Sequence, residues 1–118
     1  MTSQRLLLSG STDGRPIPVV ATATAGPLIH TSVTGTTDFD ALYLWVSNVT
    51  ASAATLTLEW GGVTNPGDHL TKGYSIAANS APIQVAVGLI VNNAKVVRAF
   101  SGTASALNIT GYVTRIGR

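Results

Sequence analysis

Any acid–base or metal chemistry in this sequence would depend on its two histidines and five carboxylates. His30 lies within a short predicted strand and His69 follows a Pro-Gly-Asp turn, and neither has a second histidine close by. A zinc site needs three or four ligands, so acidic residues would have to complete it in space: Asp13, Asp38, Asp40, Glu59 and Asp68. We therefore expect both histidines to be surface or interface residues, with no metal bound.

Two of the carboxylates are closely spaced, in Asp38-Phe39-Asp40. On an extended segment they point to the same side, an arrangement that could suit calcium binding or glycoside hydrolysis. Aspartates that precede a strand are more often turn and edge residues, and we interpret this pair in that way. The glycine-rich run 61–67 lacks the Gly-Lys-Ser/Thr of a phosphate-binding loop. Without a catalytic motif, we expect a protein that is not an enzyme and that needs no cofactor.

Charged residues are scarce, at 10% of the 118-residue chain, against about 25% in an average soluble protein. Apolar residues make up 45%, so Thr, Ser, Asn, Gly and Ala fill most of the non-core positions. A surface poor in Lys and Glu resembles a protein interface more than a free surface. Length and composition together indicate one domain that forms part of an assembly.

The basic residues are scattered, and the net charge is only +2. No cluster of them is interleaved with aromatic residues, so a nucleic-acid partner is not expected. Cysteine is absent, which excludes disulfides and thiolate metal sites. The first residues contain too short an apolar run for a secretory signal, and no stretch approaches a membrane span. We expect a soluble protein that is made inside the cell and has no membrane partner.

Short alternating runs bounded by turn residues fill the chain, and no useful helical period appears. We expect an N-terminal arm and loop in residues 1–16, in which residues 4–8 are a short strand or an extended arm, and a β-sandwich domain in residues 17–118. About eight strands predict an all-β, single antiparallel β-sandwich, as an eight-stranded jelly roll. An immunoglobulin-like sandwich is the alternative, but its Cys-Trp-Cys spacing is missing. The predicted strands of the domain are residues 17–24, 28–33, 42–46, 56–60, 69–77, 83–91, 95–100 and 107–114.

The centre of the predicted domain is a β-hairpin made of residues 42–46 and 56–60. One face of this hairpin carries the proposed core: Leu42, Leu44, Val46, Leu56, Leu58 and Trp60. The first run is apolar on its other face as well, where Tyr43 and Trp45 lie. A single sandwich layer does not account for the burial of these two rings, so we interpret them as contacts to a neighbouring subunit. Asn92-Asn93, between two apolar runs, predicts a second, tight hairpin turn.

Several stretches of the sequence resemble the head decoration, or cement, proteins that tailed bacteriophages encode beside the major capsid protein. The resemblance extends over about residues 21–116 and is carried by residues 29–48, 56–62, 66–68, 88–100 and 107–116. It implies a β-rich protein, often trimeric, that binds the outside of the expanded capsid and stabilises it by binding energy alone. The implied partners are the major capsid protein and two further copies of the chain. The implied location is the outer surface of the virion, after synthesis in the host bacterial cytoplasm.

Two segments are the predicted contacts to such a shell. The first is residues 4–15, because its charges lie in a segment too polar for the core, and the second is residues 61–72. The predicted contact residues are Arg5, Asp13, Arg15, Asp68 and Lys72. The alternative function is a head fibre or spike module that binds a host-surface glycan through aromatic residues exposed on one sheet face. A hydrolase would need a cluster of polar side chains that the sequence does not supply.

Overall fold

A computed structural model describes residues 2–117, which form nine strands and no helix. The strands are β1 (Thr2–Leu7), β2 (Ile17–Pro18), β3 (Leu28–Thr31), β4 (Phe39–Asn48), β5 (Ala54–Trp60), β6 (His69–Ile76), β7 (Ile83–Val91), β8 (Val96–Ser101) and β9 (Leu107–Gly117). Of the two possibilities left open for residues 4–8, the structure has the strand. The predicted strand 83–91 coincides with β7, and most other predicted strands differ only at their ends.

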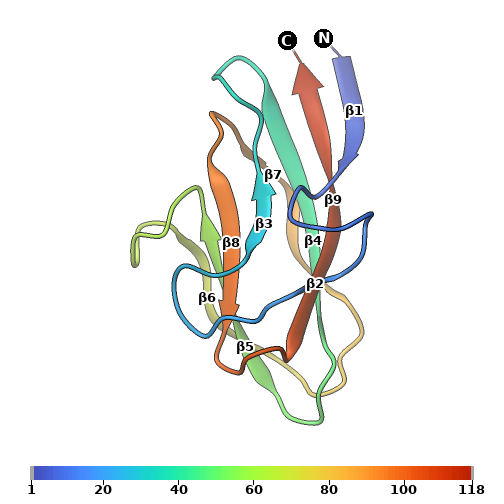
Figure 1. Cartoon of the computed structure of the whole chain (residues 1–118), viewed down its shortest axis with the longest axis vertical. Helices are drawn as coiled ribbons and strands as arrows, with labels where there is room; N and C mark the ends of the chain where they lie inside the picture. The colour runs from blue at the N-terminus through green and yellow to red at the C-terminus, as the bar shows by residue number, and fades with distance from the viewer. Residues whose placement is uncertain (1, 118) are drawn as a thin grey trace.

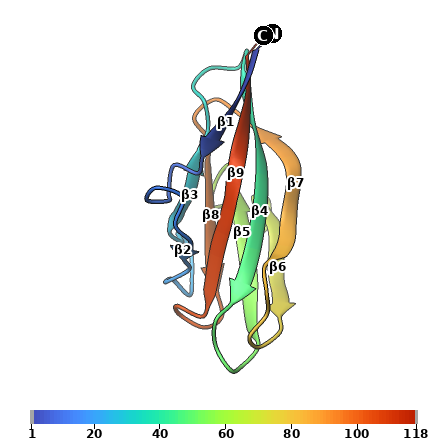
Figure 2. The ribbon, with the colours of Figure 1, turned by 90° about the vertical axis from the view of Figure 1, so that its right-hand side faces the viewer.

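The strands form two antiparallel sheets that pack face to face (Figures 1 and 2). The five-stranded sheet has the order β1-β9-β4-β7, and β2 also pairs with β9, next to β1 along the same edge. The four-stranded sheet has the order β3-β8-β5-β6. Apart from the β5–β6 hairpin, every connection from β2 onward crosses between the sheets. This strand order is that of a jelly roll, so the predicted antiparallel β-sandwich is confirmed.

The predicted central hairpin is wrong, because β4 and β5 lie in different sheets. β4 pairs with β7 and β9, and β5 pairs with β6 and β8. Their apolar faces meet across the core instead of lying side by side. The predicted hairpin at Asn92-Asn93 is wrong for the same reason, since β7 and β8 also belong to different sheets. Asn93 does have the positive φ, 61°, that the turn prediction required.

The predicted strand 17–24 is also wrong beyond its first two residues. Val19 still donates to the Leu107 carbonyl, but Ala21 accepts from Ser101 of β8 and Gly26 donates to Glu59 of β5, so the chain does not continue along β9. After β2 the chain leaves β9 and crosses to the outside of the four-stranded sheet, where it lies to the left of β8 in Figure 1. We call residues 20–27 the cover segment.

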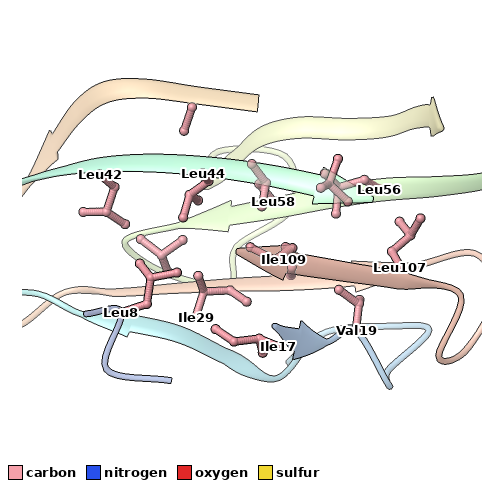
Figure 3. Packing of buried hydrophobic residues seen from close by; sticks show 14 of the residues in the cluster. Leu8, Ile17, Val19, Ile29, Leu42, Leu44, Leu56, Leu58, Leu107 and Ile109 are labelled. Atoms are coloured by element: carbon pink, nitrogen blue, oxygen red, sulfur yellow. The ribbon is translucent and has the colours of Figure 1, made fainter. Parts of the chain in front are cut away.

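The core lies between the two sheets and is made of inward-facing aliphatic side chains (Figure 3). The predicted core residues Leu42, Leu44, Val46, Leu56 and Leu58 are fully buried, and Trp60 packs against them while partly exposed. Leu8, Val19 and Ile29 close the core from the N-terminal part of the chain. Each fully buried leucine contributes about 2 kcal/mol to folding.

Candidate interaction surface

The outward side of the five-stranded sheet is almost free of charge. Strand register aligns its side chains in rows: Leu7, Tyr112, Tyr43 and Val87 are successive neighbours across β1, β9, β4 and β7. They alternate along each strand with inward-facing core residues. The adjoining rows complete the surface, which we call the open face: Arg5, Thr114, Ala41 and Ile90 on one side, and Thr110, Trp45 and Gln84 on the other.

Aromatic rings form the centre of the open face. The Tyr43 and Tyr112 rings are stacked, with centroids 4.8 Å apart and planes 17° from parallel. Trp45 lies with its centroid 6.0 Å from that of Tyr112. The guanidinium carbon of Arg5 is 4.7 Å from the Tyr112 centroid. Because β9 lies between β1 and β4, Tyr112 has Arg5 on one side and Tyr43 on the other, so both of its ring faces are occupied.

Aliphatic side chains surround the rings and are exposed. Leu7 is 59% exposed, Val87 62% and Ile90 58%. Next to Ile90 a hollow of about 380 Å³ is lined by Phe39, Ile90, Val91 and the 36–37 turn. In Figure 2, which looks onto this sheet, no other segment of the described chain covers it. Arg5 is the one charged side chain among the open-face residues, so an apolar surface of this kind is suited to contact another protein.

Gly88 allows Tyr43 to lie flat on the open face. The β4–β7 register shifts between Leu42 and Tyr43, and the extra residue is Gly88, whose φ is +65°. This is a bulge that favours glycine. A Cβ at this position would come within 3.1 Å of the Tyr43 hydroxyl.

Gly73 supplies a similar bulge, with φ +63°, in β6. The edge strands β7 and β6 are therefore both irregular, which disfavours edge-to-edge pairing with another sheet.

The cover segment lies over part of the outward side of the four-stranded sheet, at β5 and β8, while most of β6 stays exposed. Glu59 points outward from β5 yet is fully buried. Its carboxylate accepts hydrogen bonds from the Thr24 hydroxyl and, at 3.2 Å, from the Gly26 N–H. Arg98 on β8 donates to the Gly26 carbonyl at 2.9 Å, and the Ser101 N–H donates to the Ala21 carbonyl. The outward side of β5 at Thr57 and Glu59 is therefore buried within the chain itself.

A second buried carboxylate lies inside the sandwich. Asp40 is fully buried and accepts hydrogen bonds from Arg115 Nε at 2.7 Å, His30 Nε2 at 2.8 Å and the Val33 N–H at 3.1 Å. Burial by itself raises the pKa of Asp40, but the hydrogen bonds from Arg115 and His30 and the charge of Arg115 outweigh it, so the pKa lies below its usual value. The same carboxylate raises the pKa of Arg115. This network joins β3, β4 and β9.

The structure corrects two expectations about these residues. His30 is 2% exposed and bonded to Asp40, so the expected surface histidine is wrong there. Asp40 is a core ion-pair residue rather than an edge aspartate, because it has the inward phase of Leu42 and Leu44 on the same strand. The signal was present in the sequence: Arg115 has the same inward phase on β9 as Val113. His69 is half-buried, with its ring edge against Phe100.

The predicted shell contacts are not brought together. Arg5 lies on the open face, whereas Asp13 and Arg15 are exposed in the loop before β2. Asp68 accepts the Thr64 N–H at 3.0 Å within its own loop, and Lys72 is exposed near Asn65. β1 and β6 lie on opposite sides of the molecule (Figure 1), so these residues form two separate groups.

Residues 2–117 contain no group of three His, Cys, Asp or Glu side chains placed to hold a metal ion. Nor does this part of the chain contain a helix that could cross a membrane. Comparisons with protein-family models, with curated proteins and with solved structures found no match.

Proposed function

We propose that this chain is a structural protein of a phage virion, which binds the outer surface of the capsid as a trimer and stabilises the shell. The observation that carries the proposal is the open face: an apolar, aromatic sheet surface with Arg5 as its one charge. Protein interfaces are enriched in Tyr, Trp and Arg and depleted in Lys and Glu. Tyr43 and Trp45, which the sequence assigned to a subunit contact, lie at the centre of this surface.

The open face would hold the trimer, and loops outside it would contact the shell. Each chain would then offer the shell the same small set of exposed loop charges, among them Asp13 and Arg15. Three linked copies bind with a higher effective concentration than one. Ligands that bind only the intact shell stabilise it by mass action, so no bond-making chemistry is required of the protein.

The test uses expanded empty shells assembled from the major capsid protein of the same genome. We expect saturable co-sedimentation and a higher melting temperature of the decorated shells. Absence of any affinity for expanded shells would contradict the proposal. Arg15→Ala should weaken attachment and leave the oligomer intact, with Lys95→Ala, an exposed cation outside both predicted segments, as the matched control.

Arg5→Ala separates two roles for the same residue. Arg5 is a predicted shell contact, yet it packs on Tyr112 in the open face. If it serves the shell, the variant loses attachment while its mass stays that of the wild type. If it serves the subunit interface, the variant dissociates at higher concentration than the wild type.

The second candidate is a glycan-binding module of a head fibre or spike, favoured by the exposed aromatic group on one sheet face. Sugars stack on the flat faces of aromatic rings, but here both faces of Tyr112 are covered, by Tyr43 and Arg5. This arrangement favours a protein contact over a sugar platform. A glycan array probed with the wild-type protein and with Trp45→Ala distinguishes the two candidates. Glycan binding that depends on Trp45 would support the second candidate.

A further inference from the structure

Both nitrogens of the buried His30 ring have partners. Nε2 lies 2.8 Å from Asp40 Oδ2, and the backbone nitrogen of Ser9 lies 3.0 Å from Nδ1. A backbone N–H can only donate, so Nδ1 must keep its lone pair. The geometry therefore corresponds to a neutral imidazole whose hydrogen is on Nε2 and is donated to Asp40.

The charged groups near His30 lie on its Nε2 side. Asp40 on β4 contacts Nε2, Arg115 on β9 binds the same carboxylate, and Asp38 acts on Arg115 through its charge. On β8 the register neighbour of His30 is the apolar Val97. A proton added to the ring goes to Nδ1, where it meets the Ser9 N–H. Two donors then face each other, and that hydrogen bond cannot persist.

Ser9 is the point at which the N-terminal segment is tied to β3. Besides the bond to His30, the Ser9 hydroxyl accepts the Thr31 N–H at 2.7 Å, and the Gly10 N–H donates to the Ile29 carbonyl at 3.0 Å. A Cβ on Gly10 would lie 2.0 Å from the Leu28 carbonyl oxygen, so the two backbones are in direct contact. Of these three bonds, only the one to His30 has an ionisable partner.

We propose that His30 is a pH-dependent latch for the N-terminal segment, residues 2–10: protonation of Nδ1 breaks the bond from Ser9 and loosens the segment from the sandwich. β1 is included because its residues Thr2–Arg5 are exposed and it pairs with β9 alone. An edge strand with little buried surface opens more readily than the core strands. The latch is closed while Nδ1 carries no proton, and it opens when Nδ1 takes one up.

The latch also affects the open face. β1 brings Arg5 and Leu7 onto that face, beside Tyr112. When β1 loosens, the face loses its cation and one of its exposed aliphatic side chains. This consequence rests on the proposed function, whereas the latch itself is a property of the free chain, so its test needs neither a shell nor an oligomer.

The test is amide hydrogen exchange of the full chain between about pH 8 and about pH 4.5, the range in which imidazoles ordinarily titrate. Rates are corrected for the intrinsic pH dependence of exchange. We expect protection of residues 2–10 to fall about fivefold or more in acid, the fold-change of one lost hydrogen bond, while β5 keeps its protection. Ring nitrogen NMR shifts should show His30 changing from the Nε2–H form to the doubly protonated form over the same range.

His30→Asn supplies the non-titrating comparison, since its Oδ1 can accept from Ser9 at the place of Nδ1. We expect it to remove the acid response of residues 2–10. His69→Asn, at the other histidine of the chain, should leave that response unchanged. The latch is overturned if His30 stays neutral down to about pH 4.5, if it titrates while residues 2–10 keep their protection, or if His30→Asn responds like the wild type. The wild-type measurements decide even if His30→Asn does not fold.

Discussion

The two outward faces of the sandwich differ in what covers them. A sheet in a two-layer fold has a second face that its partner sheet does not cover. On the four-stranded sheet the cover segment lies across the β5 and β8 part of this face, and the buried Glu59 and the neighbouring Arg98 hold it there. On the five-stranded sheet the corresponding face carries stacked tyrosines and exposed aliphatic side chains, with no cover from the described chain.

If the proposed function holds, the difference indicates which face a second copy of the chain would cover. A loop that covers a sheet must have its backbone groups satisfied, and Glu59 does this for the N–H of Gly26. A second chain that covers a sheet needs apolar area and few charges instead. The open face has those properties and lacks buried polar anchors. We propose that the contacts of the cover segment contribute to the stability of one chain, and the open face to the association of several.

The largest expected effect comes from placing charge on the open face. Val87→Asp with Ile90→Asp puts two carboxylates on strongly exposed positions, so the isolated chain should keep its fold. Association would have to bury them, and we expect it to weaken about a hundredfold, or about 2.8 kcal/mol. Sedimentation across a range of concentrations measures this.

The control is Val63→Asp, which places one such carboxylate on an exposed valine of the β5–β6 loop, outside the open face. Its association constant should equal that of the wild type. Equal association of the double variant and the wild type would remove the distinction between the two faces.

Glu59→Ala tests whether the Glu59 carboxylate holds the cover segment in place. Without the carboxylate, the buried Gly26 N–H and the Thr24 hydroxyl lose their acceptor, which should cost about 2 kcal/mol of unfolding free energy. Urea denaturation measures the loss, and Glu59→Gln, which keeps an acceptor oxygen, should recover much of it. If alanine costs no more than glutamine, the carboxylate does not hold the cover segment.

Asp40 joins the two sheets through His30 and also binds Arg115, and its ionisation makes the stability of the fold depend on pH. Its folded pKa lies below the value of about 3.9 found in unfolded chains. Its contribution to stability is therefore complete above about pH 5 and is lost as pH falls through the folded pKa. The stability gap between the wild type and Asp40→Asn should narrow between about pH 5 and about pH 2 in urea titrations. An Asp13→Asn control, at an exposed loop position, should show no such narrowing; a gap independent of pH would contradict the assignment.

The sequence predicted the strands well because alternation is a local signal. Residues 83–91 and the alternating leucines of β5 show it clearly. Pairing is not local: β4 and β5 each have one apolar face, and that pattern fits neighbours in one sheet as well as partners across a core. The turn after Asn48 has no tight-hairpin residues to decide between them.

The candidate surface was half predictable. Tyr43 and Trp45 stood out because β4 is apolar on both faces, and the structure adds Tyr112, Arg5 and Val87, which become neighbours only through strand register. The Asp40–Arg115 pair joins residues far apart in the chain. The alternation pattern of each strand places Asp40 and Arg115 on the core side. A charged residue on the core side can be assigned a partner only when the pairing of the strands is known.

The solution mass of the wild-type chain, measured by light scattering at micromolar concentration, tests the subunit interface most directly. We expect a mass about three times the 12.1 kDa of one chain, and a weaker oligomer for Trp45→Ala with the fold retained. A stable 12.1 kDa monomer, or a Trp45→Ala trimer as stable as the wild type, would contradict it.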